Sequence, residues 1–80
     1  MRTNSMSCVT EILENDQPTL EAAQKAVGGY VEMLQVSGGQ LLVNEEGRLK
    51  GLSHNPTASE IAGQSIVGNA LFLKGSAKWK

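Results

Sequence analysis

The side chains best suited to chemistry lie in one short run near the middle of the chain. Glu45 and Glu46 are adjacent, and Arg48 follows close behind them. Adjacent carboxylates can bind a divalent cation or act as acid and base. The run lacks the alternating acidic ligands of a calcium loop, whereas asparagine and glycine around it are typical of a turn. We therefore interpret it as a solvated hairpin turn whose mixed charges form a recognition edge. The predicted binding surface comprises Asn44, Glu45, Glu46, Arg48, Lys50 and Asn55.

The only cysteine and the only histidine are the next candidates. Cys8 and His54 have the residue types of a nucleophile and its base, but no third residue is recognisable that would orient them. One cysteine gives no intrachain disulfide and no cysteine-based zinc site, and one histidine needs several partners to hold a metal. We therefore expect no catalytic residues, no metal site and no cofactor, and we predict that the protein is not an enzyme.

A pair of glycines, Gly28-Gly29, could suggest a phosphate loop. A phosphate loop runs from a strand through glycines into the first turn of a helix. Here the glycines follow a predicted helix over Thr19–Val27, whose carboxyl end repels anions. We interpret them as the signal that ends this helix.

The remaining pattern predicts the elements that position these side chains. β-Branched runs separated by glycine-rich turns favour strands, and the spacing of Leu20, Ala23 and Val27 favours a helix. The expected fold is α+β: one small domain with a mostly antiparallel sheet of four to five strands and one main helix packed on one face. Strands are expected over residues 8–13, 30–36, 41–43, 48–52 and 66–73, the middle three as a meander, with a short helical turn over 57–62.

Size and charge limit what such a domain can do. The chain has 80 residues and a formal net charge of −1, so it lacks the basic face of a protein that binds duplex nucleic acid. No apolar run approaches the roughly 20 residues that span a bilayer, and no secretory signal is visible. We expect a cytoplasmic protein with a flexible extension at 1–7, one domain at 8–73 and a basic tail at 74–80. Because a single helix covers only one face of a sheet, we also expect the other face to need a partner.

Three motifs give the sequence a family resemblance. They are V-G-G-Y-V-E at 27–32, N-E-E-G-R-L-K-G-L at 44–52 with Asn55, and I-V-G-N-A-L at 66–71. Their order resembles a family of small proteins of bacteriophages and other mobile elements, catalogued as a domain of unknown function. Ser53-His54 departs from the usual residues after the second motif, so that loop is expected to differ. The resemblance implies a phage or prophage setting in a bacterial cytosol, and it carries no catalytic residues to this chain.

Three functions follow as expectations. The first is a phage-type accessory protein that binds a host protein, such as a component of antiviral defence, and inhibits or redirects it. The second is a homo-oligomer that sequesters a nucleotide-type small molecule through Asn44, Arg48 and Lys50, because amides and cations suit bases and phosphates. The third is a weak binder of single-stranded nucleic acid through Lys74–Lys80, where lysines flank Trp79.

Overall fold

Caps and turns divide the described part of the chain into four strands and two helices. The computed structural model describes residues 8–15 and 17–75. The strands form one sheet in the order β1-β4-β3-β2, in which β1 runs parallel to β4 and the other two pairings are antiparallel. The sheet is therefore mixed. The elements are β1 (Thr10–Glu14), α1 (Leu20–Val27), β2 (Val31–Val36), β3 (Gly39–Asn44), α2 (Pro56–Ala62) and β4 (Ala70–Lys74).

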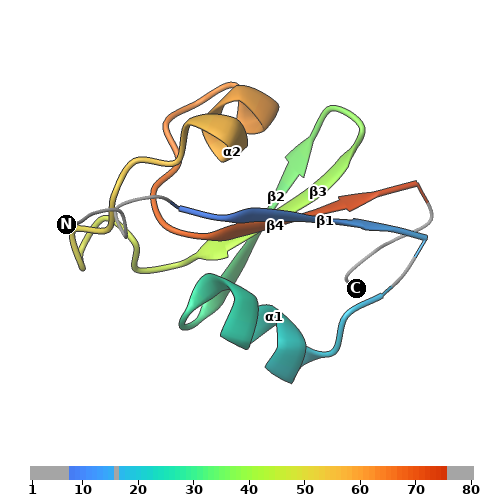
Figure 1. Cartoon of the computed structure of the whole chain (residues 1–80), viewed down its shortest axis with the longest axis horizontal. Coiled ribbons are helices and arrows are strands. Elements are labelled where there is room, and N and C mark those ends of the chain that lie inside the picture. Colours follow the sequence, from blue (N-terminus) through green and yellow to red (C-terminus); the bar gives the residue numbers. More distant parts are fainter. Residues whose placement is uncertain (1–7, 16, 76–80) are drawn as a thin grey trace, which may run out of the picture.

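The two helices lie on opposite faces of the sheet (Figure 1). Helix α1 begins where the Thr19 side chain accepts a hydrogen bond from the Ala22 N–H, and it buries Ala23 and Val27. These residues pack with apolar side chains of the two central strands, Leu42, Leu71 and Leu73. None of the helices in the described part of the chain is long and apolar enough to cross a membrane.

The second helix overturns one expectation from the sequence. Helix α2 buries Ala58 against the opposite face of the same two strands, in a cluster with Leu41, Val43, Ala70 and Phe72. The helical turn expected over 57–62 is confirmed as a seven-residue helix, and the expectation that helix packing leaves one face of the sheet uncovered is wrong. The central strands are covered on both sides, so a bare sheet face no longer argues for a partner.

The expected meander is also wrong beyond its first two strands. Residues 45–51 form consecutive turns instead of a third strand. Their backbone groups bond locally: Lys50 N–H donates to the Glu46 carbonyl, and Leu52 N–H donates to the Gly47 carbonyl. Leu49 stands between Arg48 and Lys50 in the strand expected over 48–52, where it would face the core, but it is 88% exposed. Turn formation therefore outweighed the alternation of apolar and charged residues in this segment.

Candidate functional site

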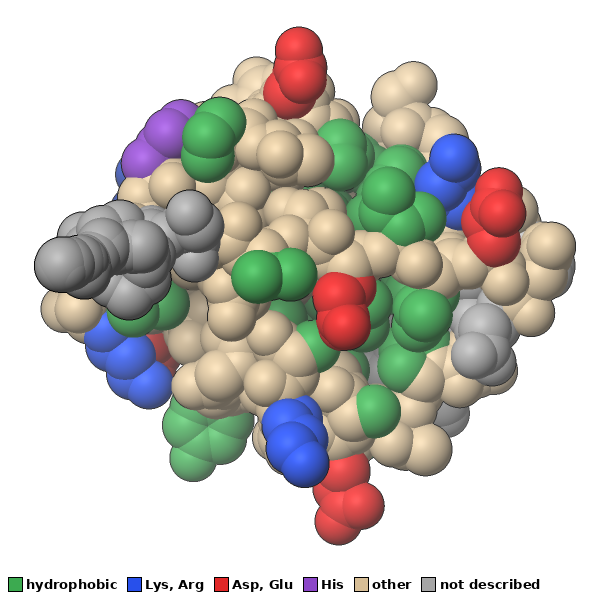
Figure 2. Space-filling view, viewed as in Figure 1, with side chains coloured by type: hydrophobic (Ala, Val, Ile, Leu, Met, Phe, Trp, Pro, Cys, Tyr) green, Lys and Arg blue, Asp and Glu red, His purple; other side chains and the backbone are tan. Residues whose placement is uncertain are grey.

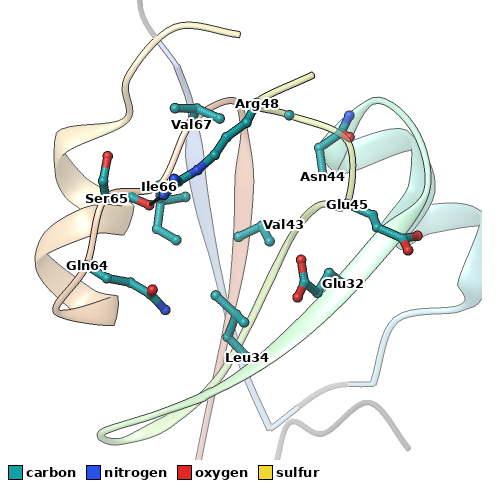
Figure 3. A pocket seen from close by; sticks show the side chains of 11 residues that line it. Glu32, Leu34, Val43, Asn44, Glu45, Arg48, Gln64, Ser65, Ile66 and Val67 are labelled. Atoms are coloured by element: carbon teal, nitrogen blue, oxygen red, sulfur yellow. Dashed lines mark hydrogen bonds between the residues drawn. The ribbon is translucent and has the colours of Figure 1, made fainter. Parts of the chain in front are cut away.

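A cleft of about 190 Å³ opens on the α2 side of the sheet, beside the outer strand β2 (Figure 3). Its apolar lining comes from three parts of the chain: Leu34 of β2, Val43 of β3 and Ile66 of the segment after α2. Strand register places the first two on one face, because Glu32 and Leu34 of β2 pair with Val43 and Leu41 of β3. The cleft therefore has an apolar floor built on the edge of the sheet.

The rim of the cleft is polar and carries both charges. Figure 3 shows the Glu32 carboxylate directed into the cleft, with Glu45 at its margin and Arg48 on the opposite side. The Arg48 Nη2 donates a hydrogen bond to the Ser65 carbonyl oxygen at 2.9 Å, which ties the turn after β3 to the segment after α2. Both glutamates are exposed. The ion pairs found among the described residues, Lys50–Glu46 and Lys74–Glu14, involve neither of them.

Asn44 holds the turn that carries Glu45 and Arg48. It is only 6% exposed. Its Nδ2 donates to the Val27 carbonyl oxygen at 3.2 Å, and its Oδ1 accepts from the Glu46 N–H at 2.8 Å. One amide thus joins the end of α1 to the turn after β3, and its polar atoms are used within the fold.

Asn55 fixes the other wall of the cleft from a buried position, 1% exposed. Its Oδ1 caps α2 by accepting from the Ala58 N–H at 3.0 Å and also accepts from Thr10 Oγ1 at 3.1 Å. Its Nδ2 donates to the Gly68 carbonyl oxygen at 2.8 Å. Ser59 adds to this network, because its Oγ accepts from the Ile66 N–H at 2.7 Å.

The six residues of the predicted binding surface thus fall into three groups. Glu45, Arg48 and the buried Asn44 line the cleft. Glu46 and Lys50 form an ion pair at 3.7 Å and do not line it. Asn55 lies inside the fold. The residues that sequence reasoning missed are Glu32 and Leu34 on β2 and the segment 64–67. A signal for Glu32 was present, since it is the only charged residue in the otherwise uncharged strand V-E-M-L-Q-V.

The other chemical candidates, Cys8 and His54, do not line the cleft. Cys8 Sγ donates to the Ser53 carbonyl oxygen at 3.2 Å, and His54 is exposed and forms a bridge with Val67. Within residues 8–15 and 17–75, no three His, Cys, Asp or Glu side chains are grouped to hold a metal ion. The extension at 1–7 and most of the basic tail, residues 76–80 with Trp79, lie outside the described residues.

A second hollow, of about 450 Å³, lies between α1 and β1. Its lining includes Glu11 from β1 and Lys25 from α1, with alanines between them. The cations predicted to hold a nucleotide-type ligand are elsewhere: Arg48 bonds to a backbone carbonyl, and Lys50 pairs with Glu46. A nucleotide-type ligand therefore stays a prediction from residue types, because Arg48 and Lys50 do not form a cluster that could bind its phosphates.

One comparison with known proteins identifies a family. The model of the family described as Domain of unknown function (DUF3846) matches residues 2–79, so the chain belongs to that family. The expectation of a domain-of-unknown-function family is thereby confirmed. No curated protein matches the chain, and no solved structure matches it.

Proposed function

We propose that this member of the DUF3846 family is a small accessory protein that acts by binding an extended segment of another protein along the open edge of β2. One observation carries the proposal: the outer strand of the sheet has an unpaired edge, and a side-chain cleft opens directly beside it. An extended segment that joins a sheet edge gains affinity from backbone hydrogen bonds and specificity from pockets for its alternate side chains.

The backbone groups available on β2 follow from its register. The Tyr30 carbonyl accepts a hydrogen bond from the Glu45 N–H at 2.8 Å, so residue 30 directs its backbone groups toward β3. Backbone direction alternates along a strand, so Glu32 and Leu34 also face β3. Val31, Met33 and Gln35 then direct their N–H and C=O groups away from the sheet. No segment within the described residues pairs with this edge.

The opposite edge of the sheet is less suited to docking. Strand β1 carries Glu11 and Glu14 within five residues, and charged side chains on an edge oppose strand addition. Strand β2 has six residues and one charge, Glu32, which lines the cleft. The edge of β2 is therefore the better site for a partner strand.

The setting proposed for this interaction comes from the sequence motifs. Their resemblance to proteins of phages and mobile elements supports a role in the bacterial cytosol, where the bound segment belongs to a host protein that is thereby inhibited or redirected. Antiviral defence proteins are the class of host target we favour. A second copy of this chain is the competing occupant of the same edge, and the test below separates the two.

The proposal is tested by replacing Gln35, whose side chain is exposed. Proline at this position removes one outward-facing N–H. An edge strand accepts proline there, because that N–H makes no hydrogen bond within the sheet. Peptides first selected on the wild-type chain from a displayed random dodecapeptide library are the probes. We expect Gln35→Pro to weaken their binding about tenfold or more in fluorescence anisotropy, the equivalent of one or two lost backbone hydrogen bonds and a steric clash.

Gln35→Ala is the matched control, because it truncates the same side chain and keeps the N–H. It should bind the peptides within about twofold of wild type, a difference well below one hydrogen bond. Equal binding by the proline and alanine variants would overturn the proposal. A wild-type chain that dimerises in native mass measurements, with Gln35→Pro monomeric, would overturn it in favour of a second copy as the occupant.

A further inference from the structure

The charges around the cleft beside β2 are unbalanced. Glu32 directs its carboxylate into the cleft and Glu45 lies at its margin, and neither takes part in the ion pairs of the described residues. The cation on the same rim, Arg48, donates across the cleft to the Ser65 carbonyl oxygen. The hydrogen bond to a neutral carbonyl leaves the charge of Arg48 in place, so one guanidinium and two carboxylates give the rim a net charge of −1. Because Arg48 lies on the opposite side of the cleft from Glu32, the side next to β2 attracts a positively charged group and repels phosphates and carboxylates.

The floor of the cleft adds a second requirement. Leu34, Val43 and Ile66 present apolar surface below the carboxylates. The volume, about 190 Å³, is below the roughly 300–1,000 Å³ of sites for whole small-molecule ligands. A long side chain with an apolar stem and a cationic end fits this cleft, because its stem packs on the apolar floor and its charge lies beside the carboxylates of the rim. Lysine and arginine bind in this way, since they bury their stems while the charged group stays hydrated.

The register of β2 places such a side chain within reach. Glu32 directs its backbone groups toward β3, so an antiparallel strand added outside β2 meets it at a position without mutual hydrogen bonds. At such positions the facing Cα atoms lie only about 4.5 Å apart and the side chains are closest. The partner residue opposite Glu32 thus points to the same sheet face as the cleft. Its side chain can extend across Glu32 toward Glu45.

We infer that the cleft selects a lysine or arginine side chain at the position of the bound segment that faces Glu32. The inference rests on the proposed function, since it assigns chemistry to a segment bound along β2. It names the sequence that a partner must contain: an extended, largely uncharged stretch with one basic residue at its centre.

The first experiment measures the contribution of the two carboxylates. The probes are the peptides selected on wild type and their copies with the basic residue replaced by norleucine, which keeps the stem and removes the charge. Glu32→Gln combined with Glu45→Gln should weaken binding of the basic peptide about tenfold, as expected for two cross-strand charge contacts, and leave the norleucine copy unchanged. Raising the salt concentration from 0.05 M to 0.5 M should reduce the difference in affinity between the basic peptide and its norleucine copy, because salt screens the attraction between exposed charges.

Glu46→Gln is the matched control, because Glu46 lies in the same turn but pairs with Lys50 instead of lining the cleft. It should bind the basic peptide as wild type does. A loss as large as that of the double variant would show that general negative charge, not the cleft, attracts the peptide, and would overturn the inference.

The second experiment reverses the preference. A new selection on Glu32→Lys should enrich peptides with aspartate or glutamate where the wild-type peptides carry lysine or arginine. A merely structural role for Glu32 cannot produce this exchange. Suppose that the peptides selected on the wild-type chain bind Gln35→Pro weakly but are not enriched in basic residues. This result would overturn the inference and leave the proposed edge binding standing. Basic peptides that bind the Gln35→Pro variant as tightly as they bind the wild-type chain would instead overturn the edge binding.

Discussion

The Asn55→Ala variant should lose about 3 kcal/mol of stability and be only marginally folded at 25 °C. The change removes the cap of α2, which contributes about 1 kcal/mol. It also leaves the buried Gly68 carbonyl and the Thr10 hydroxyl without the partners they have in the structure, at about 1–3 kcal/mol for a buried polar group. A core of this size supplies only about 3–5 kcal/mol of net stability. The loss is therefore comparable with the whole stability of the domain.

Urea denaturation followed by circular dichroism measures this loss. Asn69→Ala is the matched control, because Asn69 is also an asparagine bonded to a distant strand, accepting from the Val9 N–H, but its side chain is exposed. The Asn69→Ala substitution should lower the free energy of unfolding by less than about 1 kcal/mol, as expected for the loss of one hydrogen bond exposed to water. If Asn55→Ala unfolds at the same urea concentration as wild type, the buried network around it is not what holds α2, β1 and β4 together.

The Gly39→Ala variant should be destabilised by a similar amount, about 3 kcal/mol, the upper range for inserting atoms into a packed interior. Gly39 opens β3 beside the hairpin turn, and a Cβ atom there would overlap the Leu73 carbonyl oxygen of β4. A backbone atom in the middle of a sheet cannot move aside without disturbing the ladder. The added methyl group must therefore push β3 away from β4.

Gly28→Ala provides the comparison for this test. Gly28 ends α1 with a φ of 81°, and a Cβ atom there would meet nothing within 4 Å. Its substitution should cost only about 1 kcal/mol, the penalty for a side chain in the left-handed region. A thermal or urea midpoint for Gly39→Ala equal to that of Gly28→Ala would mean that the two strands are not as close as the structure places them.

Local signals in the sequence predicted the local parts of the fold. The helix predicted over Thr19–Val27 and ended by the glycines at 28–29 matches α1 almost to the residue, and the neighbouring strands predicted over 30–36 and 41–43 form the β2–β3 hairpin. Each of these features depends on neighbours within a few residues. The parallel pairing of β1 with β4 joins residues about 60 positions apart. No local pattern specifies that pairing, and it makes the sheet mixed.

Residue types alone predicted only part of the cleft: Asn44, Glu45 and Arg48 line it, whereas most of its lining was not predicted. Glu45 and Arg48 were singled out because charged side chains beside a turn glycine suggest recognition, and both line the cleft. Glu32 was missed because only the register between β2 and β3 brings it beside them. Asn44 and Asn55 were predicted to lie on the binding surface, because amide side chains are suited to binding ligands. Their burial depends on bonds to Val27, Gly68 and Thr10, which are distant in sequence.

The face of the molecule in Figure 2 has no extended patch of charge of one sign. Acidic and basic side chains are scattered over it, with apolar side chains between them. This face therefore gives little long-range attraction for a polyanion. Recognition then depends on short-range features, which on β2 are its backbone groups and the cleft.

Amide hydrogen exchange on the complex with a selected peptide tests the central claim most directly. Binding along β2 should slow exchange at Val31, Met33 and Gln35, whose N–H groups face outward, and leave Glu32 and Leu34 little changed, since their N–H groups already bond to β3. This alternation along one strand is specific to an added neighbour. Protection that falls instead on α1 and β1, around the second hollow, with Met33 and Gln35 exchanging as in the free chain, would contradict the account.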